Sequence, residues 1–236
     1  QGLIFSIAAF GVYITFRILD FPDMSVDGTF PLGAAVTAMC IVKGMNPFAA
    51  SILSFGAGCI GGFFTGILHV KLKISNLLSG ILVMIGLYSI NLRIMTKSNV
   101  PLFGQKTIFS SNVNLLLMLF IIMIIVKVIL DLFLKTKLGF ALKAVGDNEQ
   151  LVTSLSLNKD NIKLTGLAIS NGLAALSGSM MAQYQGFSDV GMGTGTVVMG
   201  LAAVILGESV FGKIRSLKPT TTALFGSILY KAAIAL

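Results

Sequence analysis

The chain has 236 residues and a formal net charge of +8, with 55% hydrophobic and only 11% charged residues. Its apolar residues come in long runs such as "VNLLLMLFIIMIIV", which lack the polar face of a soluble helix. Because a bilayer core about 30 Å thick needs about 20 apolar residues per helix, the composition predicts an all-α polytopic membrane protein with about eight spans or half-spans. The basic residues lie between apolar runs without aromatic interleaving, so membrane topology explains the charge better than nucleic-acid binding does.

The apolar runs predict membrane segments in chain order, with boundaries good to about four residues. They lie near Leu3–Leu19, Pro31–Val42, Pro47–Val70, Asn76–Asn91, Val113–Leu134, Ile162–Tyr184, Thr196–Gly207 and from Thr220 to the end. The chain begins at Gln1 rather than Met and stops inside an apolar run. We therefore expect residues 1–236 to form a single transmembrane domain that is a fragment of a longer subunit.

A polar passage at residues 135–161 sets the orientation. If it is cytoplasmic, alternation across the spans places most of the loop Lys and Arg residues inside, in agreement with the positive-inside rule. The inner loops then hold Arg17, Lys71, Lys73, Lys135, Lys137, Lys143, Lys159, Lys163, Lys213, Arg215 and Lys218, and the outer loops hold Lys43, Arg93, Lys97 and Lys106.

Small residues form a stripe in the third apolar run, "GAGCIGGFFTG". Gly58 and Gly62, and then Gly62 and Gly66, have GxxxG spacing, which favours close approach of another membrane helix.

Two passages resemble each other, "FPDMSVDGTFPLGAAVT" from Phe21 and "FSDVGMGTGTVVMGLAAVI" from Phe187. Each leads into an apolar run too short to cross comfortably, and such paired segments are typical of discontinuous helices in two halves of a transporter. An odd number of spans separates them, so the repeat is inverted. Half-helix N-termini can stabilise carboxylates or polar solute groups. The competing interpretation is a chance recurrence of small-residue turns. The aligned helix-start residues are Asp23, Gly28 and Thr29 in the first passage and Asp189, Gly195 and Thr196 in the second.

The polar passage itself, "ALKAVGDNEQLVTSLSLNKDN", predicts two short helices. Residues 138–145 form the first, which Gly146 ends in a left-handed conformation. Asp147 caps the second, which carries an apolar stripe at Leu151, Val152 and Leu155. The pair would make a knob that docks on another protein. The alternative is a helix pair that lies on the lipid headgroups.

The run "GFALKAVGDNEQLVTSLSLNKDNIKLTGLAISNGLAALSGSMMAQYQGFSDVGMGTGTVVMGLAAVILGE" resembles the permease subunits of ATP-binding-cassette (ABC) importers in the branched-chain amino acid and ribose permease superfamily. The segments "YITFRILDFPDMSVDGTFPLGAA" and "GFSDVGMGTG" are most similar to its uncharacterised or aromatic-amino-acid-associated branch. The resemblance covers nearly the whole chain. It implies that residues 135–161 are a coupling loop that sits in a groove of a separate ATPase. That role would fall on Leu142, Ala144, Gly146, Asp147, Asn148, Glu149 and Leu151.

The same resemblance implies the partners and the location. They are cytoplasmic ATPase subunits that bind ATP and Mg, an extracellular solute-binding protein and a second permease copy in a homodimer. The location is the bacterial cytoplasmic (inner) membrane, among lipid.

The sequence contains no phosphate loop of the form G-x-x-x-x-G-K-[ST] and no His–carboxylate or Cys–His grouping. We therefore predict no catalytic residue, metal ligand or cofactor in this chain. The alternative function is an ion-coupled secondary transporter, which also favours inverted repeats. The acidic residues of this chain, however, cluster at span ends rather than deep in the bilayer. A third possibility is a membrane scaffold that transports nothing.

Uncharged polar residues within the spans are candidates for a translocation path. Amides and hydroxyls suit a small polar or zwitterionic solute, and the family resemblance favours an amino acid. Interhelical hydrogen bonding explains the same residues equally well. They are Ser89, Asn91, Ser170, Asn171, Gln183, Tyr184 and Gln185.

Overall fold

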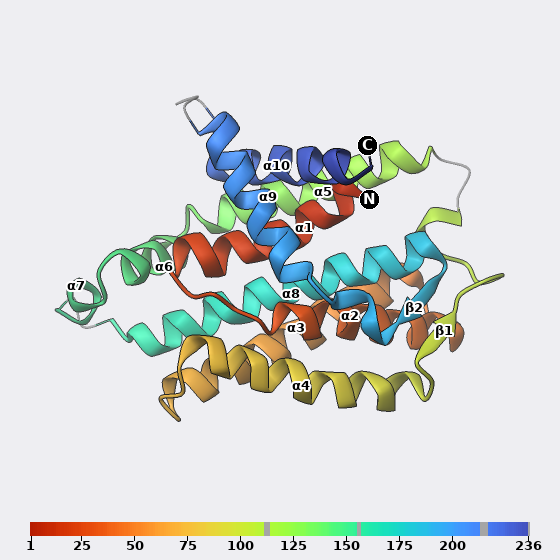
Figure 1. Ribbon diagram of the computed structural model, residues 1–236, viewed down its shortest axis with the longest axis horizontal. Coiled ribbons are helices and arrows are strands. Elements are labelled where there is room, and N and C mark those ends of the chain that lie inside the picture. The colour runs from red at the N-terminus through yellow and green to blue at the C-terminus, as the bar shows by residue number, and fades with distance from the viewer. Residues whose placement is uncertain (111–113, 155–156, 213–216, 236) are drawn as a thin grey trace.

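A computed structural model describes residues 1–110, 114–154, 157–212 and 217–235 as an elongated helical bundle (Figure 1). It confirms the expected all-α polytopic membrane fold. The helices are α1 (Gly2–Val12), α2 (Val26–Val42), α3 (Pro47–Val70), α4 (Asn76–Met95), α5 (Leu115–Phe133), α6 (Lys137–Asp147), α7 (Glu149–Ser154), α8 (Lys159–Gln185), α9 (Thr196–Phe211) and α10 (Pro219–Ala235). A π-helix η1 (Tyr13–Ile18), the 3₁₀ turns η2 (Ile108–Ser110) and η3 (Val190–Gly193), and the strands β1 (Asn99–Pro101) and β2 (Phe187–Asp189) complete the described elements.

Four described segments are long and apolar enough to cross a membrane: α3, α4, α5 and the stretch Val190–Phe211. The last of these corrects the expectation of a segment too short to span, because η3 precedes α9 directly. The stretch is nevertheless broken, since Gly195 between the two has a left-handed backbone with φ of 80°. The stretches Gly2–Ile18 and Val26–Val42 are shorter apolar helices.

Helix α2 begins at Val26 and not at Pro31, where the apolar run was expected to start a helix. The backbone N–H groups of Gly28 and Thr29 both donate to the Ser25 carbonyl oxygen at 2.9 Å, which opens the helix one turn earlier. Pro31 therefore lies inside the helix rather than at its first position.

Helix α8 lies at the centre of the bundle and packs against α1, α2 and α3 (Figure 1). Small residues permit this. A methyl group at Gly58 of α3 would lie 2.5 Å from the Asn171 carbonyl oxygen, and one at Gly62 would overlap the Leu167 carbonyl. The GxxxG stripe thus forms the predicted close helix contact.

Two further helix pairs approach each other through reciprocal glycine contacts. Gly33 of α2 lies against the Ala175 carbonyl of α8, and Gly178 of α8 lies against the Phe30 carbonyl of α2. Helices α9 and α10 repeat the arrangement. There Gly207 faces the Thr222 carbonyl and Gly226 faces the Ala203 carbonyl. Any side chain at these positions would overlap backbone atoms of the partner helix.

The two ends of the bundle differ in structure. At one end α6 and α7 project as a knob, which we define as residues 137–154 (Figure 1). At the other end β1 and β2 pair in an antiparallel ribbon, with Val100 opposite Ser188. Asp131 near the knob end of α5 accepts hydrogen bonds from Lys218 Nζ at 2.9 Å and Thr220 Oγ1 at 2.6 Å, which ties α5 to the start of α10.

Cysteines on either side of α5 test the topology. Gln105→Cys lies in the loop after the ribbon, and Lys135→Cys lies between α5 and the knob; both positions are exposed. In a background without Cys40 and Cys59, we expect an impermeant thiol reagent added to one side of sealed vesicles to modify only one of them. Modification of both from the same side would contradict the span at α5.

Candidate functional site

The starts of α2 and α9 lie side by side and are joined by one carboxylate. Asp27 in the first turn of α2 accepts hydrogen bonds from the backbone N–H of Gly195 at 3.0 Å and of Val197 at 2.7 Å. The first N–H groups of a helix have no partner within it and carry partial positive charge. Asp27 therefore satisfies and neutralises the start of α9 from a different helix.

From this junction the two helices run toward opposite ends of the bundle (Figure 1). Helix α2 leads to the ribbon end, where Ile41 shares a core cluster with Met95 and Val100. Helix α9 leads to the knob end, where Glu208 forms an ion pair with Arg17 at 3.0 Å. The two helices thus leave the junction in different directions, with α9 running obliquely across α1 (Figure 1), and the inverted relation of the two halves stays a prediction.

A second buried carboxylate fixes the start of α2. Asp23 is only 3% exposed, and its Oδ1 accepts the Ser25 N–H at 2.8 Å. Its Oδ2 accepts a bond from Asn171 Nδ2 of α8 at 2.7 Å, and Thr29 Oγ1 donates to Asn171 Oδ1 at 2.8 Å. Ser25 Oγ lies between this carboxylate and this amide, 2.6 Å from Asp23 Oδ1 and 3.0 Å from Asn171 Oδ1. This cluster holds the first turn of α2 against α8.

The predicted helix-start residues have different roles in the two passages. Gly195 provides the left-handed turn before α9. Gly28 is helical and lies in the first turn of α2. A methyl group on it would lie 3.0 Å from the Met84 Cα, so the close packing of α4 requires a small residue there. Thr196 Oγ1 is buried without a hydrogen-bond partner. Asp189 matches Asp23 in one contact, because the Oδ1 atom of each accepts the N–H of the residue two positions on, Gly191 or Ser25, at 2.8 Å. Asp189 differs in that it lies on β2 and is only half-buried.

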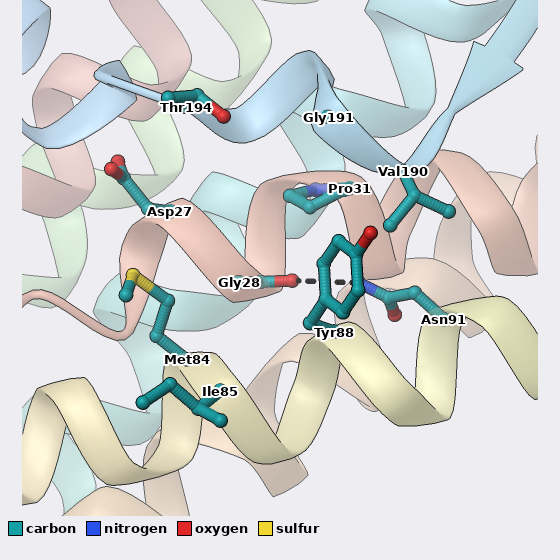
Figure 2. Close-up of a pocket in the computed structure, with 10 residues that line it drawn as sticks. All are labelled: Asp27, Gly28, Pro31, Met84, Ile85, Tyr88, Asn91, Val190, Gly191 and Thr194. Atoms are coloured by element: carbon teal, nitrogen blue, oxygen red, sulfur yellow. Dashed lines mark hydrogen bonds between the residues drawn. The ribbon is translucent and has the colours of Figure 1, made fainter. Parts of the chain in front are cut away.

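A cavity of about 370 Å³ opens beside this junction, between α2, α4 and η3 (Figure 2). Asn91 of α4 lies on its wall and is fully buried. Its Nδ2 donates to the Gly28 carbonyl oxygen at 3.2 Å, whereas its Oδ1 has no partner. The lining residues are Asp27, Gly28, Pro31, Met84, Ile85, Tyr88, Asn91, Val190, Gly191 and Thr194.

The other candidate path residues do not gather at this cavity. Ser170 Oγ donates to the Gly11 carbonyl oxygen at 2.7 Å, and Gln183 Nε2 donates to Ser51 Oγ at 2.9 Å. These two and Asn171 are fully or almost fully buried and link helices, as the alternative interpretation expected. Ser89, Tyr184 and Gln185 are exposed. Of the seven candidates, Asn91 alone lines the cavity, and Asn171 holds the helix start next to it.

Sequence reasoning did not include Asp27 among the site residues, although it placed this acid at a span end. The available signal was an acidic side chain in the first turn of a discontinuous helix. Such a residue is suited to pair with exposed N–H groups.

The knob differs from its predicted form at the turn. Gly146 has a helical backbone within α6 and no left-handed turn. Glycine is required there because a side chain would overlap the Ile18 carbonyl of η1. Asn148, and not Asp147, caps α7, since its Oδ1 accepts the Gln150 N–H at 3.0 Å. Asp147 is exposed at the end of α6.

The apolar surface of the knob also differs from the expected stripe. Val152 of α7 is fully buried, Leu155 and the side chain of Leu151 lie outside the described part, and Leu142 is only 1% exposed. The exposed apolar side chains are on α6 instead, where Phe140 is 62% exposed. Ala144 is half-buried, as is Glu149, which ties α7 to the start of α8 through Lys159 at 3.0 Å and through Lys163.

The hydrogen bonds of Asn171 and Ser170 of α8 lead to a prediction about the stability of the protein. Asn171→Ala leaves the buried Asp23 carboxylate without its amide donor, and bonds to charged groups are worth about 2 kcal/mol. Ser170→Ala removes one neutral bond between membrane helices, which is worth about 0.6 kcal/mol on average. We therefore expect Asn171→Ala to lower the thermal unfolding midpoint of the purified protein clearly more than Ser170→Ala. Equal shifts would contradict the structural role of the Asp23 cluster.

Residues 1–233 match the family described as "Branched-chain amino acid transport system / permease component". The chain is 54% identical over 234 residues to the "Tyrosine transport system permease protein" of Clostridioides difficile, an alignment that covers 99% of this chain and 79% of that protein. It is 38% identical to "Uncharacterized protein RP368" of Rickettsia prowazekii, with 98% and 84% covered.

A more distant relative is the "Autoinducer 2 import system permease protein LsrC" of Photorhabdus laumondii, 26% identical over 78% of this chain and 56% of that protein. No solved structure matches the chain significantly. The helical fold, the broken α9 and the match across almost the entire sequence agree, and the chain belongs to the branched-chain amino acid type of ABC transport permeases.

Proposed function

We propose that this permease forms the translocation path of an ATP-driven importer for an amino acid, with an aromatic amino acid such as tyrosine as the preferred solute. The proposal on the solute is supported by the relative named as a tyrosine transport permease. The path would pass the facing starts of α2 and α9. There Asp23, Asp27 and Asn91 place two carboxylates and an amide within the bundle.

The partners in this proposal are those of ABC importers in general. A cytoplasmic ATPase binds ATP and Mg and docks on the knob, and a solute-binding protein delivers the solute at the ribbon end. A second permease copy completes the assembly in the bacterial inner membrane. The exposed Phe140, Asp147 and Asn148 would meet the ATPase, whereas the buried Leu142 would support the knob from inside.

A single contact carries the proposal that the knob drives the path. Gly146 of α6 packs directly on the Ile18 carbonyl at the end of η1. Leu142 contributes to the same layer, since a methyl group at Gly166 of α8 would lie 2.6 Å from both Leu142 Cδ2 and Leu19 Cδ1.

Only a short stretch of backbone joins this contact to the start of α2. Only residues 19–25 separate η1 from α2, and Asp23 lies within them. Asp27 then connects α2 to α9. A displacement of the knob by an ATPase would therefore reach both half-helices through atoms that are in contact.

The Gly146 contact can be tested with a matched pair of variants. Gly146→Ala adds a methyl group that overlaps a backbone carbonyl, and such overpacking costs about 1–3 kcal/mol. Gly86→Ala adds the same group to α4 in open space. In proteoliposomes with the ATPase and the solute-binding protein, we expect Gly146→Ala to lose most ATP-dependent tyrosine uptake and solute-stimulated ATP hydrolysis. Gly86→Ala should retain both.

Unchanged coupling in Gly146→Ala would overturn the route through η1. Absence of ATP-dependent uptake of any amino acid by the wild-type complex would overturn the proposed function itself.

The attachment of the knob to α8 depends on pH. The Lys163 ammonium, and then that of Lys159, lowers the pKa of the Glu149 carboxyl below its ordinary value. Because the folded-state pKa is lowered, this stabilisation is present above the ordinary carboxyl pKa of about 4.3 and is lost as pH falls through the lowered value. Hydrogen exchange of α7, corrected for intrinsic rates, should therefore be slow at neutral pH and accelerate only in acid.

Glu149→Gln removes the ionised acceptor, so its α7 should exchange fast already at pH 7. Asp147→Asn neutralises an exposed carboxylate of the same knob and serves as the control, with exchange like that of the wild type. Slow exchange in Glu149→Gln at pH 7 would show that the ion pairs do not hold α7.

A further inference from the structure

The helix starts at the junction are already neutralised by the chain itself. Asp27 accepts the N–H groups of Gly195 and Val197 at the start of α9, and Asp23 accepts the Ser25 N–H just before α2. A solute carboxylate would have to displace one of these internal carboxylates and approach the other. The facing helix starts therefore do not provide the carboxylate site that unoccupied helix N-termini provide.

The cavity beside the junction presents hydrogen-bond acceptors instead. Asp27 is the one charged residue among those that line it. Asn91 Oδ1 is buried without a donor, although nearly all buried side-chain oxygens in proteins have one. The Gly28 carbonyl fixes the orientation of the amide, because turning it over would place two oxygens face to face. The missing partner must be an N–H or O–H group.

The remaining walls of the cavity are apolar. Pro31, Met84, Ile85 and Val190 supply aliphatic and thioether surface, and Tyr88 supplies an aromatic ring (Figure 2). Tyr88 lies one helical turn before Asn91 and is 54% exposed. Its ring stands beside the buried Asn91 amide (Figure 2). Because Asn91 Oδ1 has no contact with solvent, a side chain of the wall must move before a solute group can reach this oxygen. A volume of about 370 Å³ is in the range of small-molecule sites.

We propose that this cavity binds the ammonium end of an amino acid during its passage, with Asn91 Oδ1 as the acceptor and the solute side chain against Met84, Ile85 and Tyr88. This inference rests on the proposed transport of an amino acid and adds the chemical group that the permease itself recognises. The carboxylate end of the solute makes no essential contact in this cavity.

The test uses protection of a cysteine rather than uptake. Thr194→Cys places a thiol on the exposed wall of the cavity in the complete transporter complex, in a background with Cys40 and Cys59 replaced by Ala. The probes are L-tyrosine, tyramine, which lacks the carboxylate, and 3-(4-hydroxyphenyl)propionate, which lacks the ammonium group. A ligand at about ten times its Kd slows modification about tenfold if it excludes the reagent.

We expect L-tyrosine and tyramine to slow modification of the thiol and the propionate to leave it unchanged. Asn91→Leu keeps the shape but removes the acceptor, and should abolish protection by both amines. Asn91→Asp retains an acceptor with added charge, and should preserve protection by tyramine, which also shows that the site is folded. Ile90→Ala, an exposed neighbour on α4, is the control and should behave like the parent protein.

Three results would overturn the proposal: equal protection by the propionate, undiminished protection in Asn91→Leu, or no protection by any probe, which would mean that water alone satisfies Asn91. Uptake separates this outcome from failure of the proposed function. A complex that imports tyrosine without protecting the thiol would retain the function and lose the site. A complex that shows protection by tyramine but imports no amino acid would retain the site and lose the function.

Discussion

The arrangement depends on the Asp27 carboxylate that spans from α2 to the start of α9. A helix that begins inside a membrane protein has no water to satisfy its first N–H groups, so another part of the protein must do so. Asp27, which lies 168 residues before Gly195 in the sequence, provides the acceptor oxygens for these N–H groups. The first turn of α9 is therefore held by α2, and the start of α2 is held in turn by the bond between Asp23 and Asn171 of α8.

This order of dependence explains why one small region combines structural and functional demands. Of the two carboxylates that hold the helix starts, Asp27 also lines the cavity beside them and gives it its negative charge. Because the acidic partners are built into the chain, what remains available to a solute is acceptor oxygen and apolar wall. Asp23 lies within residues 19–25, which connect the Gly146 contact to α2, and Asp27 follows in the first turn of α2, so a short stretch of chain joins the knob to the cavity.

Much of the fold could be predicted because membrane spans, glycine stripes and span-end charges are local patterns. The close contacts of Gly58 and Gly62 and the break at Gly195 are of this kind. The role of Asp27 was not accessible, since its partners are distant in sequence. Gly146 was misjudged for the same reason: a glycine near a helix end indicates a left-handed turn, but here the constraint is the Ile18 carbonyl.

Other parts of the site were ambiguous in principle. Asp147 and Asn148 are both good capping residues, and only the packing of α6 decides that Asn148 caps α7. Buried hydroxyls and amides can line a path or join helices. Ser170 and Gln183 have partners on other elements, whereas Asn91 has an oxygen to spare.

The reciprocal glycine contacts have a mechanical consequence. Carbonyl groups of α2 and α8 are each seated against a glycine of the other helix, and those of α9 and α10 are likewise, so neither pair can slide without collision of main-chain atoms. The two helices of each pair therefore move as one rigid unit. Gly195, with its left-handed backbone, lies where the chain enters the α9–α10 pair, and the hydrogen bonds of Asp27 join this pair to the α2–α8 pair. Alternation between open and closed forms would then be a tilt of one helix pair relative to the other about Gly195, with the hydrogen bonds of Asp27 linking the two pairs.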